Sequence, residues 1–271
     1  MKFAICNEIF QGWKLDDALA FAAKTGYDGV EIAPFTIAKY VTDISAGDRR
    51  TIRDAAARHR VAIPGIHWVL AQTEGLHMTH PDRAVRDRTA GYFCDLADFC
   101  ADVGGQVIVV GSPKQRNRMD GVSGQQAWDW ASEVFRPAVE RAQERQVTIC
   151  LEPLSPSETD FINTAAEAIR FVRSFKSPRF KIILDVKAMC SEGKPIPDII
   201  RESWPDFAHF HANDANLKGP GFGDVDFHPI ARALEGTGYD GWVSVEVFKF
   251  EEGPEVIATK SLECLRRAFG K

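Results

Sequence analysis

The chain has 271 residues, of which 45% are hydrophobic and 26% are charged, and its formal net charge at pH 7 is −5. These values are ordinary for a globular enzyme, and the length suits one barrel domain. Nucleic-acid-binding proteins usually carry a basic surface, so the negative net charge argues against a nucleic-acid partner.

The N-terminal sequence MKFAICNEIF has neither a long apolar segment nor a small-residue cleavage site. No stretch of the sequence reaches the roughly 20 apolar residues of a membrane span. Six cysteines occur without any CxxC pair, which is typical of reduced thiols. We therefore expect a cytoplasmic protein that does not contact a membrane.

Strand-like and helix-like segments alternate along the chain. Short apolar runs predict eight strands, at residues 2–6, 29–33, 61–67, 106–111, 147–152, 180–185, 207–211 and 242–246. Segments with helical apolar periodicity lie between them, for example at residues 15–24, 85–103, 125–145, 165–175 and 255–269. This alternation predicts an α/β fold, a single (β/α)8 TIM barrel over residues 1–271.

An internal repeat supports the barrel. The segment TGYDGVEI at residues 25–32 recurs as TGYDGWVSVEV at residues 237–247. In both places a glycine-containing turn leads into a strand that carries a glutamate facing the barrel interior. No Pro/Ser-rich linker interrupts the chain, so one domain is the simplest prediction.

Four residues of metal-ligand type end consecutive predicted strands, and each strand ends in a turn or loop: Glu152 in VTICLE, Asp185 in FKIILD, His211 in FAHFH and Glu246 in WVSVE. They recur about every 30 residues, the length of one βα unit, so they meet at one end of the barrel. Alternation along each strand points them inward. One such residue could simply be a satisfied polar group, but four together predict a metal site.

Three carboxylates and one imidazole favour one divalent ion, with Mn²⁺, Mg²⁺ or Co²⁺ preferred and Zn²⁺ as an alternative. Such an ion can polarise a sugar carbonyl and acidify the neighbouring C–H bond. Proton transfer at that carbon needs a base, and epimerisation also needs a proton donor on the opposite face. Glu152 and Glu246 are the candidates for these two roles.

Other residues near the strand ends could bind a sugar. His67 and Trp68 follow the third strand, where the imidazole could contact a hydroxyl and the indole could cover an apolar sugar face. Lys114, in the loop GSPKQRN after the fourth strand, and Lys187 could contact a carbonyl or phosphate oxygen. Alternatively, His67 is a buried core histidine, and Lys114 and Lys187 are solvated loop residues.

Four motifs carry a family resemblance over essentially the whole chain: LEPLSPSETDFINT at residues 151–164, ILDVKAM at 183–189, HFHAND at 209–214 and GWVSVEVF at 241–248. With these motifs the chain resembles the sugar-phosphate isomerase/epimerase superfamily with the xylose isomerase-like barrel, and especially the D-tagatose/D-psicose 3-epimerases. The resemblance implies one divalent ion, commonly Mn²⁺, on the four ligand residues. It also implies proton exchange by the two glutamates and contact of Glu158 with substrate hydroxyls.

Two positions depart from that family. The resemblance implies a histidine three residues after the metal-binding aspartate and an arginine six residues after the metal-binding histidine, where this chain has Ala188 and Leu217. Both family residues hold the carbonyl end of a linear ketose. We therefore expect a small-molecule sugar substrate that is cyclic or differently anchored, such as an inosose or another keto-sugar derivative.

Three alternatives remain open at this stage. The first is a metal-dependent dehydratase or lyase, which would share the enolisation step and then expel a hydroxyl. The second is a DNA-repair endonuclease of a related barrel family, which the acidic charge disfavours. The third is a non-catalytic sugar-binding barrel. The outer helices could also pair into a homo-oligomer, which the sequence does not decide.

Overall fold

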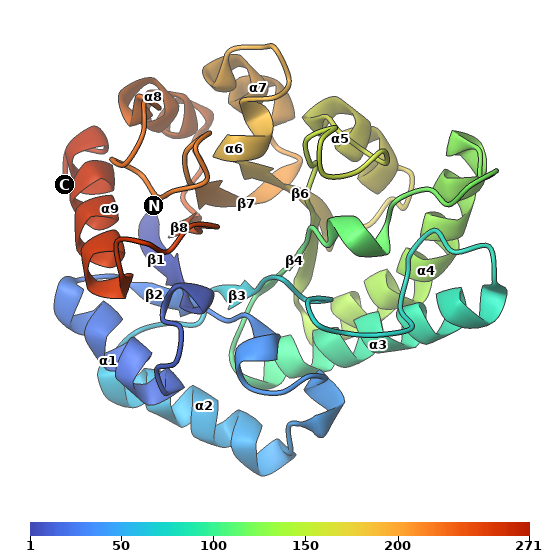
Figure 1. Cartoon of the computed structure of the whole chain (residues 1–271), viewed down its shortest axis with the longest axis horizontal. Coiled ribbons are helices and arrows are strands. Elements are labelled where there is room, and N and C mark those ends of the chain that lie inside the picture. Colours follow the sequence, from blue (N-terminus) through green and yellow to red (C-terminus); the bar gives the residue numbers. More distant parts are fainter.

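Eight parallel strands form the wall of a central barrel, and helices surround it (Figure 1). The computed structural model describes residues 1–271. The strands are β1 (Lys2–Cys6), β2 (Gly29–Glu31), β3 (Gly65–Ile66), β4 (Val107–Val110), β5 (Thr148–Leu151), β6 (Phe180–Asp185), β7 (Phe207–Ala212) and β8 (Trp242–Val245). Their order in the sheet is β2-β1-β8-β7-β6-β5-β4-β3.

The barrel is nearly closed between β2 and β3. These two strands are joined only by two isolated parallel bridges, Gly29 with Ala62 and Ile32 with Ile66. The predicted strand at residues 61–67 is reduced to two residues in β3. Pro64 lies within this segment and has no N–H group to donate to a neighbouring strand. The predicted TIM barrel is confirmed, with this one weak seam.

Helices follow the strands around the outside of the barrel (Figure 1). They are α1 (Leu15–Thr25), α2 (Ala46–His59), α3 (Arg83–Asp102), α4 (Gly124–Arg145), α5 (Ala165–Arg173), α6 (Val186–Met189), α7 (Ile196–Ser203), α8 (Phe227–Thr237) and α9 (Pro254–Ala268). Short 3-10 turns lie at Asn7–Ile9, Pro34–Thr36, Val41–Asp43 and Pro113–Gln115. No helix has the length and apolar character needed to cross a membrane.

The apolar residues separate into two layers. One large cluster fills the space between the strands and the helices, and a small cluster of Val107, Val109, Cys150 and Ile183 lies apart from it. Cys150 and Ile183 each precede a predicted metal ligand by two residues, so they share a strand face with Glu152 and Asp185. The interior of the barrel is therefore polar at the carboxyl ends of its strands and apolar deeper inside, away from those ends.

Candidate active site

The carboxyl ends of β5 to β8 bring the four predicted ligand residues to one rim of the barrel. Glu152, Asp185, His211 and Glu246 are all buried. Asp185, His211 and Glu246 form a compact group, in which one ligand atom of each residue lies within 4.8 Å of the others. Glu152 is not part of this group, but it lines the same cavity as Glu246. Three residues are thus placed to share one ion, with the fourth beside them.

Two buried atoms in this group are suited to bind a cation. His211 Nδ1 and Glu246 Oε2 lie 3.2 Å apart, and neither makes a hydrogen bond. Buried polar atoms are seldom left without a partner, because their desolvation costs free energy. One nitrogen and several carboxylate oxygens also form a donor set suited to Mn²⁺ or a similar divalent ion. The residues present therefore fit the metal site expected from the sequence.

Neighbouring groups hold these three ligands in fixed orientations. His211 Nε2 lies 3.2 Å from Glu31 Oε1, which leaves Nδ1 facing Glu246. The amide of Asn213 donates to Asp185 Oδ2 at 2.6 Å. The indole N–H of Trp68 donates to Glu246 Oε1 at 2.7 Å. Partners of this kind set the direction and basicity of metal ligands.

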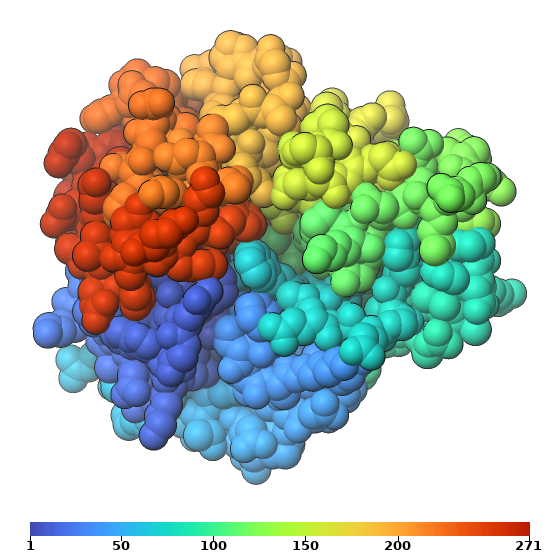
Figure 2. Space-filling model, in the orientation of Figure 1, coloured from blue at the N-terminus to red at the C-terminus, as the bar shows by residue number.

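A cavity of about 350 Å³ opens beside the group. On the face drawn in Figure 2 the surface is hollowed near its centre, where differently coloured segments of the chain converge. Five predicted site residues line the cavity in addition to Glu246: Trp68, Lys114, Glu152, Glu158 and Lys187. Its volume is within the range of small-molecule sites. His67 is fully buried and does not line this cavity.

Lys187 supplies a buried positive charge to the cavity wall. Its Nζ lies 2.7 Å from Glu158 Oε1 and 4.0 Å from the centre of the Phe248 ring. Phe248 in turn stacks on Trp68 at 5.8 Å. Burial lowers the pKa of Lys187, but the charges of Asp185 and Glu152 outweigh this effect and raise it above its ordinary value. The ammonium group therefore stays charged.

The two candidate acid/base residues have opposite pKa shifts. Burial, followed by the charges of Glu246 and Asp185, raises the pKa of Glu152 to about 8. Burial would also raise the pKa of Glu246, but the charge of His211 outweighs it and holds this pKa below its ordinary value. In the absence of a bound cation, these shifts favour the protonated form of Glu152 and the ionised form of Glu246. Such divergence within one site is typical of an acid and a base.

The main chain at Gly111 lies close to the Glu152 side chain. A Cβ atom added at Gly111 would lie 2.2 Å from Glu152 Oε2, so a larger residue there would force the carboxylate to move. On the other side, the buried guanidinium of Arg116 donates to the carbonyl of Glu152 at 2.7 Å and to that of Ile162 at 3.0 Å. Arg116 therefore stabilises the loops around Glu152 and is not free to bind an anion.

Several residues around the site were not assigned these roles from the sequence. Glu8, Glu31, His209 and Asn213 are buried: Glu8 contacts His67, Glu31 contacts His209 and His211, and Asn213 donates to Asp185. The repeat at residues 25–32 predicts an inward Glu31, and His209 lies two residues before His211 and so shares its strand face. Glu8 lies in a 3-10 turn after β1, where neither the two-residue period of a strand nor the 3.6-residue period of an α-helix applies.

The profile of the xylose isomerase-like TIM barrel family matches residues 19–268. D-psicose 3-epimerase of Agrobacterium fabrum (strain C58) is 27% identical over 233 residues, which cover 83% of this chain and 76% of that protein. The 3-dehydro-D-guloside 4-epimerase of Escherichia coli (strain K12) is 23% identical over 273 residues, covering 98% of this chain and 99% of that protein.

Solved structures show the same fold. A crystal structure of D-psicose 3-epimerase in the presence of D-fructose matches with a TM-score of 0.88 at 22% identity, covering 100% of both chains. A second, of D-psicose 3-epimerase with D-tagatose from Clostridium cellulolyticum H10, has a TM-score of 0.88 at 22% identity and covers 99% of both chains.

The protonation of His211 makes metal binding dependent on pH. Burial lowers the pKa of His211, but the charges of Glu246 and Glu31 outweigh it and hold this pKa well above its ordinary value. A cation must therefore displace a proton from Nδ1, and the Mn²⁺ affinity should increase by up to about tenfold per pH unit between pH 6 and 8. Calorimetry in buffers with different ionisation enthalpies should detect the released proton. An affinity that does not change with pH, without proton release, would contradict this assignment.

The contact at Gly111 gives a second prediction. Gly111→Ala should push the Glu152 carboxylate from its position and lower kcat by about 10²-fold, because misplacement of a catalytic group by about 1 Å costs that much. Gly236→Ala is the matched control, because an added Cβ there meets nothing within 4 Å. Steady-state turnover and thermal unfolding should be measured on both variants. Equal turnover in both would show that the position of Glu152 is unimportant.

Proposed function

The chain belongs to the xylose isomerase-like TIM barrel family, and on this premise we propose that it is a divalent-metal-dependent epimerase of a keto-sugar or related polyol. Mn²⁺ is the proposed ion, held by Asp185, His211 and Glu246 with Glu152 as the fourth ligand or near neighbour. The relatives reported above are named as sugar epimerases and support this class of reaction.

One observation carries the proposal: two buried glutamates from different strands face the same cavity. Glu152 follows β5 and Glu246 follows β8, so two strands separate them along the sheet. A substrate bound between them could exchange protons on both of its faces. A sugar-binding protein without catalysis would have no need for this pair of carboxylates, which are costly to bury.

The reaction follows from these positions. A bound divalent ion would polarise the substrate carbonyl and acidify the neighbouring C–H bond. Glu246, which is ionised, removes the proton from that carbon, and Glu152, which is protonated, delivers a proton to the opposite face. The configuration of the carbon is thereby inverted. One turnover leaves Glu246 protonated and Glu152 ionised, and exchange with solvent restores the starting state.

The cavity wall supports a substrate anchored differently from a linear ketohexose. Ala188 is buried, and its N–H group donates to Asp185 Oδ1 at 2.8 Å. The Leu217 carbonyl accepts the N–H of Phe248 at 2.9 Å. Neither residue lines the cavity, whereas Lys187 and Glu158 do. We propose that this ion pair contacts the substrate oxygens, and that the substrate is a cyclic keto-sugar derivative such as an inosose.

Dehydration is the second candidate reaction. Glu152 and Glu246 line the same cavity, and after Glu246 has removed the first proton the carboxyl of Glu152 could equally protonate a departing hydroxyl. Mass spectrometry of the products separates the two reactions, since loss of water changes the mass of the sugar and epimerisation does not.

Replacement of either glutamate should remove the acid/base function. Glu152→Gln and Glu246→Gln should each lower kcat by about 10²-fold to 10⁴-fold, the usual contribution of a positioned acid or base. Turnover should be measured by resolving the epimeric sugars chromatographically, with metal content determined for each variant. Glu133→Gln is the control, because Glu133 lies on α4, 58% exposed, and pairs with Arg86. Retention of wild-type turnover by both active-site variants would refute the two-carboxylate mechanism.

A further inference from the structure

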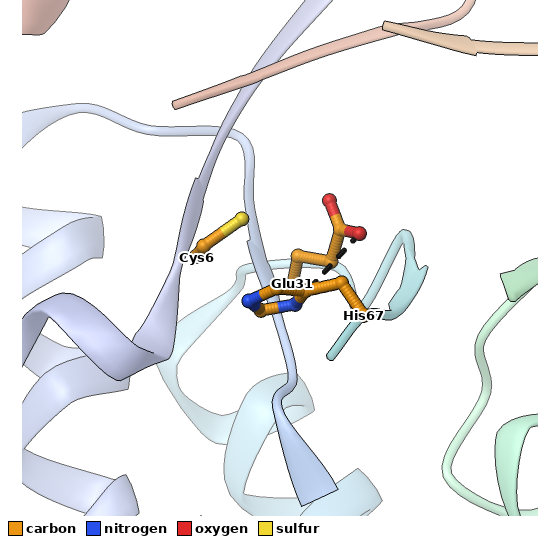
Figure 3. A group of neighbouring side chains, drawn as sticks. All are labelled: Cys6, Glu31 and His67. Atoms are coloured by element: carbon orange, nitrogen blue, oxygen red, sulfur yellow. Dashed lines mark ion pairs between the residues drawn. The ribbon is translucent and has the colours of Figure 1, made fainter. Parts of the chain in front are cut away.

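A second group of ligand-type residues lies at the carboxyl ends of the first three strands. Cys6 ends β1, Glu31 ends β2 and His67 directly follows β3. All three are fully buried, and one ligand atom of each lies within 4.8 Å of the others. Figure 3 shows the thiol, the carboxylate and the imidazole converging inside the barrel. None of the three belongs to the group of Asp185, His211 and Glu246.

The imidazole of His67 is held with one nitrogen unpartnered. Its Nε2 lies 2.6 Å from Glu8 Oε2. Its Nδ1 is buried and has no hydrogen-bond partner. A carboxylate bound to the far nitrogen of a histidine is the arrangement that commonly supports a metal-binding imidazole. Here Nδ1 is the nitrogen that faces Glu31.

The spacing of the group suits a bridging ion. Glu31 Oε1 lies 3.8 Å from His67 Nδ1, which is too long for a hydrogen bond. Two atoms bound to the same tetrahedral zinc ion lie about 3.3 to 3.6 Å apart, given zinc bonds of about 2.0 to 2.3 Å. A small shift of the side chains would therefore bring both atoms to an ion. Without an ion, the two atoms are too far apart to hydrogen-bond to each other.

Glu31 has the capacity to bind an ion in addition to its present partners. Its Oε2 lies 2.8 Å from His209 Nε2 and 3.3 Å from His211 Nε2, and its Oε1 lies 3.2 Å from His211 Nε2. A carboxylate offers about four lone-pair positions, so these three contacts leave room for one more partner. The Cys6 thiol makes a hydrogen bond with the Ser244 hydroxyl at 3.5 Å.

We propose that Cys6, Glu31 and His67 bind a second metal ion, zinc, which Glu31 connects to the His211 ligand of the first site. A thiolate, an imidazole and a carboxylate are together a zinc-binding set, and three protein ligands leave one tetrahedral position for water. On binding, the Cys6 thiol releases its proton to solvent, as does any proton held on His67 Nδ1, and a Zn–S bond forms. A cavity of about 500 Å³ is lined by Glu8, the partner of His67, and by none of the three ligand residues. This proposal does not depend on the sugar substrate.

Cobalt is the probe for this site, because a cobalt–thiolate bond absorbs in the near ultraviolet by charge transfer. The full-length chain should be stripped with a chelator, titrated with Co²⁺ and followed by absorption and metal analysis. We expect two cobalt ions per chain and a charge-transfer band that Zn²⁺ removes by displacement. One cobalt ion per chain without this band would overturn the proposal.

Variants assign the band to its ligands. Cys6→Ser and His67→Gln should each bind a single cobalt ion, and Cys6→Ser should lose the band. Cys190→Ser is the matched control, because Cys190 is exposed and should contribute to neither signal. A band that persists in Cys6→Ser would place the thiolate elsewhere and overturn the assignment. The wild-type titration decides the proposal even if a variant fails to fold, and loss of sugar turnover is not used as a readout.

Discussion

The burial of several carboxylates inside one barrel is the constraint on which the rest of the structure depends. Glu8, Glu31, Glu152, Asp185 and Glu246 are all nearly inaccessible to solvent. Buried carboxylates must be paired with cations or donors, or else take up protons. In this chain the imidazoles of His67, His209 and His211 and the ammonium of Lys187 lie beside these carboxylates. The pKa of the remaining carboxyl, Glu152, is raised. The proposed divalent cation would complete this balance.

The same constraint explains why the site is rigid. Each ligand of the proposed ion has a partner that fixes its orientation: Trp68 for Glu246, Asn213 for Asp185 and Glu31 for His211. Trp68 adopts a backbone φ of 50°, in the left-handed region that non-glycine residues rarely occupy, and its ring stacks between Phe35 and Phe248. Strained conformations of this kind persist where the surrounding packing determines them, and here they direct the indole N–H to Glu246.

The barrel and the positions of the ligand residues follow from local patterns in the sequence. Alternation along β5 to β8 fixes which side chains face inward, and the repeat length brings their ends to one rim, so Glu152, Asp185, His211 and Glu246 could be predicted to lie near one another. The role of Glu8 was missed because it lies in a 3-10 turn, and that of Arg116 because its partners are carbonyl groups remote in sequence. Helix α2 has a weak sequence signal, since AGDRRTIRDAAARH has few apolar residues to mark a buried face.

The central claim is that two different carboxylates exchange a proton on a carbon beside a carbonyl. Its most direct test is isotope exchange in D₂O with added Mn²⁺, using a panel of ketoses, inososes and keto-sugars and analysis of the products by mass spectrometry. The account predicts incorporation of one deuterium at the carbon next to the carbonyl in each molecule converted, with no incorporation after addition of EDTA. Conversion of a sugar without deuterium in the product would contradict it, since the proton delivered by Glu152 comes from solvent.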